Sequence, residues 1–286
     1  MEQKLALVLS GGGSLGALQV GALQAICEHG FQPDLIVGVS VGSVNGAYLA
    51  LNGFSQDSLE RMAAVWRDAA RYDLLPSNYL RIALRRMLGR GGGNPAARLR
   101  EFIIAQGLTP ELTFAALQKP RLVVVSADLN TGKPVLHGLD GDENVLDSIM
   151  LSTALPPWFM PIRKQNAYLV DGGMVSNLPI EPALRLGATH IVALDLMDSR
   201  EWREDRNGVT GFLDRLAFSV ERRYADLELE LAKAQGVPTL YLGLSEGLQI
   251  PFWDFSHTEE MIDRGYEIAH RVLEARQEWI PGMDSR

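Results

Sequence analysis

The chain has 286 residues, of which 47% are hydrophobic, and this is enough apolar material for one large α/β domain with a substantial core. Its net charge of -8 argues against a nucleic-acid-binding surface, which needs a basic stripe. Cys27 is the only cysteine and excludes an internal disulfide, and no apolar run reaches the length of a membrane-spanning helix, so we expect a cytoplasmic protein.

Short apolar strands alternate with longer helical patterns along the chain. Because the strands are almost continuously apolar, they are typical of a mostly parallel central sheet with helices on both faces. A turn at Thr131 and Gly132 predicts one antiparallel hairpin within this α/β fold. The predicted strands are Leu5–Ser10, Asp34–Ser40, Arg121–Leu129, Ala167–Asp171, His190–Leu196 and Thr239–Leu244. The predicted helices are Ala17–Glu28, Ser43–Leu51, Ser55–Arg71, Phe212–Ala234 and His257–Trp279.

Two regions stand apart within the single domain expected over residues 1–286. Residues 72–110 are interpreted as a helical cap or lid, interrupted by the glycine-rich segment Gly89–Pro95, and residues 200–286 as a C-terminal helical region. The apolar and basic stretch Tyr72–Arg90 is interpreted first as a helix that packs on the core. The alternative is peripheral docking of this stretch on an anionic membrane surface.

The segment Gly38-Val39-Ser40-Val41-Gly42 joins a predicted strand to a predicted helix. This pattern is typical of a nucleophile elbow, in which a tight turn presents the serine oxygen at the carboxyl edge of the sheet. Gly38 and Gly42 let neighbouring backbone approach without a Cβ clash, and the amino end of the following helix directs N–H groups at the same point. Ser40 is therefore the candidate nucleophile.

A glycine-rich loop, Gly11-Gly12-Gly13-Ser14-Leu15-Gly16, follows the first predicted strand. It lacks the lysine of a phosphate-binding loop, and Asp34 begins the next strand instead of ending it, which departs from a dinucleotide-binding fingerprint. We interpret the backbone N–H groups of the loop as donors to an oxyanion. A nucleotide-binding α/β protein is the alternative.

The strand Ala167–Asp171 ends in a carboxylate and then turns through Gly172 and Gly173. A carboxylate at the end of a strand in the same sheet as Ser40 can face the same cleft. Five apolar residues just before this strand are interpreted either as the wall of an acyl pocket or as ordinary core. They are Met150, Leu151, Trp158, Phe159 and Met160.

These segments together resemble the patatin-like phospholipases, because four motifs occur in the order found in that family. The motifs are the glycine-rich loop, the elbow at Ser40, Ser152-x-Ala154-x-Pro156 with Pro161 downstream, and Asp171-Gly172-Gly173. The likeness covers about Leu5 to Leu196. It implies a patatin-like, acyl-transferase-like three-layer α/β sandwich and a serine lipid acyl hydrolase, that is, an esterase of the phospholipase A or lysophospholipase type.

The resemblance also implies a catalytic dyad in which Ser40 is the nucleophile and Asp171 is the base. Neither a cofactor nor a catalytic metal is expected, because no histidine has a partner at metal-ligand spacing. The expected partner is a lipid or another ester, with no nucleic acid. The positions matched to the oxyanion loop and to substrate binding are Gly11, Gly12, Gly13, Ser14 and Val41.

Three alternatives to this interpretation stay open. The chain order Ser40, Asp171, His257 would suit the triad of an α/β-hydrolase, although we interpret His257 as an N-terminal helix residue. The same fold could transfer the acyl group to an acceptor other than water. A non-catalytic member could use the fold to bind a lipid or a protein.

Overall fold

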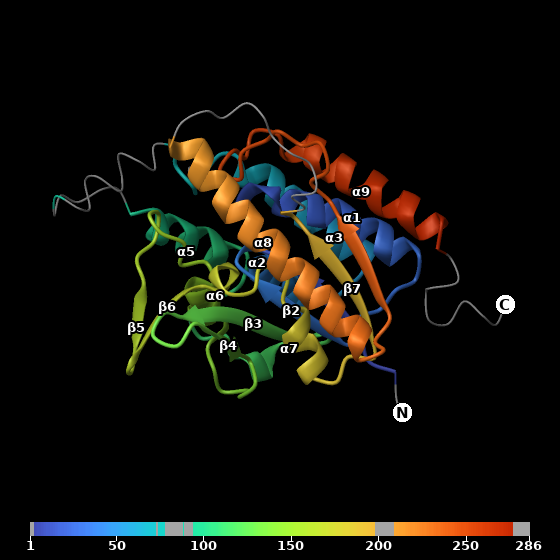
Figure 1. The fold of residues 1–286 in the computed structure, drawn as a ribbon, viewed down its shortest axis with the longest axis horizontal. Coiled ribbons are helices and arrows are strands. Elements are labelled where there is room, and N and C mark those ends of the chain that lie inside the picture. The colour runs from blue at the N-terminus through green and yellow to red at the C-terminus, as the bar shows by residue number, and fades with distance from the viewer. Residues whose placement is uncertain (1–2, 73, 78–87, 89–93, 198–208, 277–286) are drawn as a thin grey trace.

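The computed structural model describes residues 3–72, 74–77, 88, 94–197 and 209–276 (Figure 1). The strands within these residues are β1 Leu5–Leu9, β2 Leu35–Val39, β3 Arg121–Asp128, β4 Lys133–His137, β5 Ile162–Lys164, β6 Ala167–Asp171, β7 His190–Asp195 and β8 Thr239–Gly243. They form one eight-stranded sheet in the order β5-β6-β3-β2-β1-β7-β8, with β4 paired to β3. The pairs among β3, β2, β1, β7 and β8 are parallel, and the pairs that involve β4, β5 or β6 are antiparallel.

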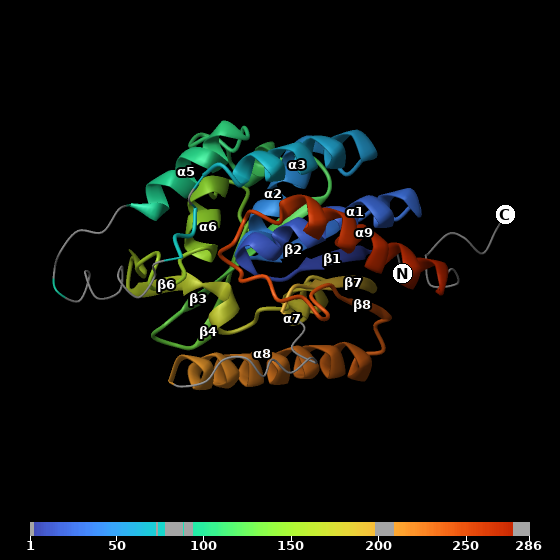
Figure 2. The same ribbon diagram turned by 90° about the horizontal axis from the view of Figure 1, so that it is seen from above.

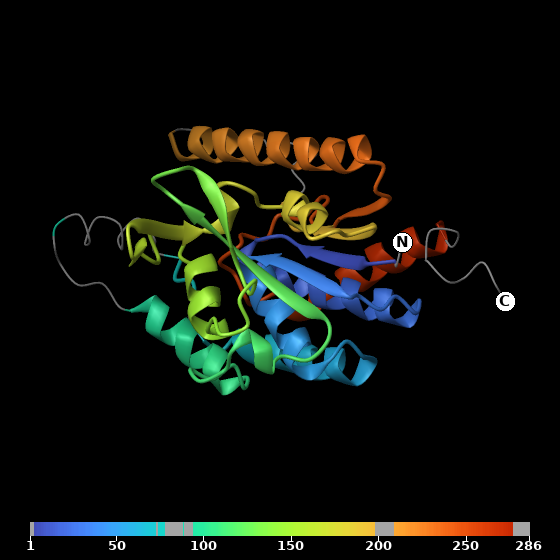
Figure 3. The same ribbon diagram turned by 90° about the horizontal axis from the view of Figure 1, so that it is seen from below.

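Helices cover both faces of the sheet and make a three-layer α/β sandwich (Figure 2). One face carries α1 Gly16–Glu28, α2 Val41–Asn52, α3 Gln56–Ala69, α5 Pro95–Ala105, α6 Val145–Ser152 and α9 Thr258–Glu274. The other face carries α7 Ile180–Arg185 and the long α8 Val209–Ala234, which Figure 3 shows lying along the sheet. Short 3-10 turns span Gly13–Leu15, Phe114–Ala116 and Gly172–Met174.

The apolar strands divide their side chains between two cores. In β1, Leu7 and Leu9 pack against the layer of α1, whereas Ala6 and Val8 pack against α7 and α8. All four side chains are fully buried, because a strand that is covered on both faces exposes neither set of alternating side chains. This double burial explains why the sequence of β1 is apolar without interruption.

The predicted fold class is confirmed, and the predicted strands occur with nearly the predicted bounds. The expected hairpin at Thr131 and Gly132 joins β3 to β4, and Ser55 caps α3 by accepting a hydrogen bond from the Ser58 N–H. The region expected to be helical over residues 200–286 also supplies β8 to the sheet. Most of the stretch Tyr72–Arg90 lies outside the described residues, as does the end of the helix expected to reach Trp279.

No helix in the described part of the chain combines the length and the apolar character that crossing a membrane requires.

Pairing within the sheet brings two distant residues to the same level. Val39 of β2 pairs with Val125 of β3, and the next residue of β3, Ser126, pairs with Asp171 of β6. Ser40 follows Val39 directly, so Ser40 and Asp171 lie at the same level on opposite sides of β3. The glycine-rich loop lies at the same edge of the sheet as Ser40, because it follows β1, which is the other neighbour of β2.

Candidate active site

Ser40 occupies a strained turn between β2 and α2. Its backbone has φ 51° and ψ −125°, a conformation that non-glycine residues rarely adopt. Residues strained in this way cluster at functional sites. The turn depends on glycine at both flanking positions. A Cβ atom on Gly42 would lie 2.2 Å from the Leu9 carbonyl oxygen, and one on Gly38 would lie 2.4 Å from the Gly42 carbonyl oxygen. The elbow interpretation of the sequence therefore agrees with the backbone geometry.

The motif Ser152-x-Ala154-x-Pro156 holds both members of the candidate dyad. The Ser152 hydroxyl accepts a hydrogen bond of 2.8 Å from the Ser40 N–H and donates one of 2.6 Å to the Val125 carbonyl. Two residues later, the Ala154 carbonyl accepts a bond of 3.1 Å from the Asp171 N–H. One short segment therefore fixes the backbone of Ser40 relative to that of Asp171. The sequence indicated the motif but not this contact.

Asp171 is a buried carboxylic acid with few polar partners. Its side chain accepts a hydrogen bond of 2.8 Å from the Gly173 N–H, and the residue is 3% exposed. Burial raises the pKa of Asp171 from 3.8 to about 6, and this effect outweighs the opposing influence of the Ser40 hydroxyl and the Gly173 N–H. A carboxylate of this pKa is ionised at neutral pH and is a stronger base than an exposed aspartate.

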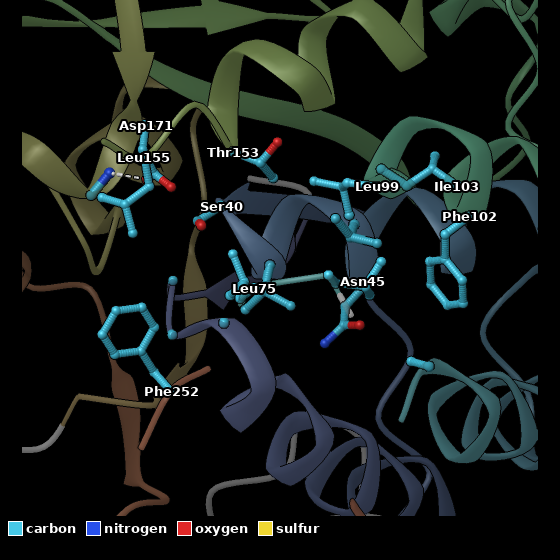
Figure 4. Close-up of a pocket in the computed structure, with 18 of the residues that line it drawn as sticks. Ser40, Asn45, Leu75, Leu99, Phe102, Ile103, Thr153, Leu155, Asp171 and Phe252 are labelled. Atoms are coloured by element: carbon cyan, nitrogen blue, oxygen red, sulfur yellow. Dashed lines mark hydrogen bonds between the residues drawn. The ribbon is translucent and has the colours of Figure 1, made fainter. Parts of the chain in front are cut away.

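The Ser40 hydroxyl lies close enough to influence the Asp171 carboxyl group, but the two side chains do not meet the geometry of a formed hydrogen bond (Figure 4). Long contacts of this kind are common in free enzymes and shorten when substrate binds. His257, the histidine of the alternative triad, is the exposed N-cap residue of α9 and contacts Glu260 at 3.0 Å. The described residues that line the pocket around Ser40 include no histidine.

The glycine-rich loop passes directly beside the serine. A Cβ atom on Gly11 would lie 3.0 Å from the Ser40 Cβ atom. The Gly11 N–H donates to the Asn177 carbonyl at 3.4 Å, whereas the N–H groups of Gly12 and Gly13 have no acceptor among the described residues. Gly12, Gly13 and Val41, the residue after the nucleophile, all line the same pocket as Ser40. These three positions are the ones at which backbone N–H groups could serve an oxyanion site beside Ser40.

Ser14 has a different position from the one expected for a substrate-binding residue. It is fully buried, its N–H donates to the Phe252 carbonyl at 2.7 Å, and its hydroxyl donates to the Pro251 carbonyl at 3.2 Å. Both of its donors are therefore engaged within the protein. These contacts attach the glycine-rich loop to the segment before α9, and this attachment is the role that the geometry gives to Ser14.

Asn177 and Glu221 are among the pocket residues that were not identified from the sequence. The side-chain amide of Asn177 donates to the Gly11 carbonyl at 3.3 Å. Its Oδ1 atom lies 2.8 Å from the position that a Cβ atom of Gly173 would occupy. Asn177 therefore bridges the glycine-rich loop and the turn after Asp171. Glu221 of α8 also lines the pocket. Burial raises the pKa of Glu221 to about 7, with smaller contributions from the negative charges of Asp195 and Asp171.

The pocket has a volume of about 320 Å³, and Figure 4 shows lining residues on both sides of Ser40. We call one part the helical side, because α2, α3 and α5 line it, and the other the loop side. The helical side is formed by Val44, Asn45 and Tyr48 of α2, by Met62, Val65, Trp66 and Ala69 of α3, and by Leu99, Phe102 and Ile103 of α5 together with its C-cap residue Gln106. The loop side is formed by Asp171, Gly173, Met174, Asn177, Met197 and Glu221.

Of the five residues considered for an acyl pocket, only Phe159 is among the described residues that line this one. Met160 is 56% exposed, and Trp158 packs against Phe252 with ring centroids 5.5 Å apart. The expected cap region contributes instead through α5. The described residues contain no group of three or more histidine, cysteine, aspartate or glutamate side chains arranged to hold a metal ion.

Comparison with known sequences gives one family and several relatives. A family model described as patatin-like phospholipase matches residues 7–184, which is more than half of the chain. The uncharacterized protein YqhO of Bacillus subtilis is 28% identical over 190 residues, which cover 60% of this chain and 64% of that protein. Patatin-like phospholipase domain-containing protein 7 of Mus musculus is 29% identical over 216 residues, which cover 74% of this chain and 15% of that protein.

Among solved structures, human GIVD cytosolic phospholipase A2 in complex with methyl gamma-linolenyl fluorophosphonate aligns with a TM-score of 0.53 and 11% sequence identity. The alignment covers 96% of this chain and 57% of that one, and the likeness is one of fold. The chain spans less than two thirds of the length of each of these three proteins.

Proposed function

Because this chain belongs to the patatin-like phospholipase family, we propose that it is a serine lipid acyl hydrolase that cleaves a carboxylic ester of a lipid with Ser40 and Asp171. The observation that carries the proposal is the combination of a strained serine elbow with a buried aspartate of raised pKa at the same level of the sheet. This combination supports the assignment of a nucleophile and a base, and the N–H groups of Gly12 and Gly13, which have no acceptor among the described residues, support an oxyanion site.

Acylation begins when the Asp171 carboxylate takes the proton of the Ser40 hydroxyl and the Ser40 oxygen attacks the ester carbonyl carbon. The carbonyl oxygen becomes an oxyanion and is held by the N–H groups of Gly12, Gly13 and Val41. Loss of one such donor typically lowers kcat by roughly 100-fold to 1000-fold. The bond to the alcohol then breaks, and the leaving oxygen takes the proton from Asp171.

Deacylation repeats these steps with water as the nucleophile. Asp171 accepts a proton from the water molecule, whose oxygen attacks the acyl-serine. The Ser40 oxygen leaves and recovers its proton from Asp171, so that a carboxylic acid is released and the free enzyme is restored. Because every proton passes through Asp171, activity requires this side chain to be ionised in the free enzyme.

Covalent labelling tests the proposal directly. An alkyl fluorophosphonate should add one adduct to the protein at Ser40, as shown by intact mass and peptide mapping, and Ser40→Ala should give no adduct. Ser40→Ala should also abolish hydrolysis of p-nitrophenyl octanoate, with an unchanged circular-dichroism spectrum. Absence of an adduct on the folded wild-type protein would contradict the assignment of Ser40. Transfer of the octanoyl group to an added alcohol at the expense of free acid would instead identify an acyltransferase.

A further inference from the structure

The pocket offers two chemically different environments on the two sides of Ser40. On the helical side, Figure 4 shows Leu99, Phe102 and Ile103 lying across the pocket from Asp171. The loop side contains both carboxyl groups among the described lining residues, those of Asp171 and Glu221, beside apolar side chains such as Leu155 and Phe252, which Figure 4 shows on the Asp171 side of Ser40. An ester that reacts at Ser40 must place its acyl part on one side and its alcohol part on the other, so the contrast gives the bound substrate a direction.

Two polar side chains that line the pocket, Asn45 and Thr153, are already hydrogen-bonded within the protein. The Asn45 amide group donates to the Gln19 side chain at 2.9 Å and to the Gly16 carbonyl at 3.1 Å, and its oxygen accepts from the Trp66 ring N–H at 3.0 Å. Nearby, the Thr153 hydroxyl donates to the Ile149 carbonyl at 2.9 Å. Because these groups have partners, they do not need a ligand's polar atoms, and the surface they leave is suited to a hydrocarbon chain.

The volume of the pocket limits the length of such a chain. A buried apolar cavity of about 150 Å³ accommodates benzene, which has six carbon atoms. The whole pocket of about 320 Å³, with both sides of Ser40 counted together, therefore has room for roughly a dozen carbon atoms by proportion, and the helical side has room for fewer. This is enough for one acyl chain of medium length, and it is too small for two long chains together.

Helix α5 supplies the far end of this side. Ile103 is 1% exposed and Ala69 of α3 is 2% exposed, and both line the pocket. Gln106, the C-cap residue of α5, lines it as well and is only half-buried. Size changes at these positions alter the space available to the end of a chain without touching Ser40 or Asp171.

We propose that the helical side of the pocket is a binding site for a single medium-length acyl chain and that Ile103 and Ala69 determine the chain length that it accepts. The proposal rests on the proposed function, because it assigns the acyl half of the same ester substrate. It assigns the alcohol half to the loop side.

The experiment compares kcat/KM for p-nitrophenyl butyrate, octanoate, dodecanoate and palmitate, all presented in the same detergent. For the wild-type protein, kcat/KM should be highest for the octanoate ester and much lower for the palmitate ester. Ala69→Leu should move the optimum toward butyrate, and Ile103→Ala should move it toward dodecanoate. Each methylene group gained or lost in the buried contact changes kcat/KM by about fourfold. A change of three carbons in the side chain should therefore alter the ratio of kcat/KM for dodecanoate to that for butyrate by roughly 50-fold.

Matched controls make the same chemical changes away from the pocket. Ala63→Leu lies on α3, and Ile26→Ala lies on α1, and both residues are buried but are not among the pocket-lining residues. These variants should keep the wild-type profile even if their melting temperatures fall. If Ala69→Leu does not fold, Gln106→Trp, at a half-buried position, should shift the optimum in the same direction.

A binding measurement separates this proposal from the proposed function. Titration of Ser40→Ala with decanoate should show saturable binding that Ala69→Leu weakens in the same background. Binding without any ester hydrolysis by the wild type would support the acyl site and overturn the proposed activity. Hydrolysis with an identical chain-length profile in wild type, Ala69→Leu and Ile103→Ala would overturn the acyl site and keep the proposed activity.

Discussion

Replacing Asp171 with asparagine should inactivate the protein and make it more stable. The pKa of Asp171 rises from 3.8 to about 6 in the folded state, chiefly because of burial. Two pKa units correspond to about 3 kcal/mol of free energy of unfolding. Since the raised pKa means that the folded state binds the proton more tightly, this stability is present below about pH 4 and is lost as the pH rises through about 6.

Asparagine is uncharged at every pH and keeps an oxygen that can accept the hydrogen bond from the Gly173 N–H. The melting temperature of Asp171→Asn at pH 8 should therefore exceed that of the wild type by about 5 °C, for a chain of 286 residues. The difference should shrink steadily between about pH 6 and pH 4. Thermal unfolding of both proteins across this pH range measures it. A variant that is less stable at pH 8, or a difference that does not depend on pH, would refute the reasoning.

Three further predictions concern residues around the dyad. Ser14→Ala removes the hydroxyl that donates to the Pro251 carbonyl and should loosen the glycine-rich loop. Steady-state kinetics should then show kcat lowered about tenfold with little change in KM. An unchanged kcat would contradict this role of Ser14. Activity should rise with pH through about 6 as Asp171 ionises. It should rise again through about 7, because ionised Glu221 adds a second negative charge that makes Asp171 a stronger base. In pH–rate profiles, Glu221→Gln should lose only the second step, and a profile identical to the wild type would count against this coupling. His257→Ala should retain most of the activity, since this side chain is exposed at the start of α9, and an inactive but folded variant would favour a histidine triad.

The sequence was sufficient to predict the elements that carry the candidate site where those elements depend on local pattern. The elbow at Ser40 and the glycine-rich loop each follow a buried strand, and both patterns are carried by adjacent residues. The strand ending at Asp171 was also predicted, but its direction in the sheet was not. β6 runs antiparallel to β3, so its register with Ser126, and not a shared carboxyl edge, brings Asp171 level with Ser40. Strand pairing is a long-range choice that a five-residue segment does not specify.

Residues that act through tertiary contacts were missed for a related reason. Glu221 belongs to a helix rich in charged side chains, and by sequence it is indistinguishable from neighbours that face solvent. His137 of β4 is 3% exposed and contacts the Ser126 hydroxyl at 2.8 Å, a tertiary contact that the local sequence pattern does not indicate. α6 was also not predicted, although Asn144 caps it by accepting from the Asp147 N–H, because its eight residues are too few for a clear periodic pattern.

The placement of Ser40 at the rim of the sheet lets the two helical layers contribute to one pocket from opposite directions. The layer of α2, α3 and α5 encloses the space on one flank of the serine, while α8 reaches the other flank from the far layer through Glu221. Under the proposed assignment of the acyl half to the helical side, substitutions in one layer should change the fit of one half of the substrate with little effect on the packing of the other layer. Such a division makes selectivity for the two halves of an ester separately adjustable, both for natural divergence and for engineering.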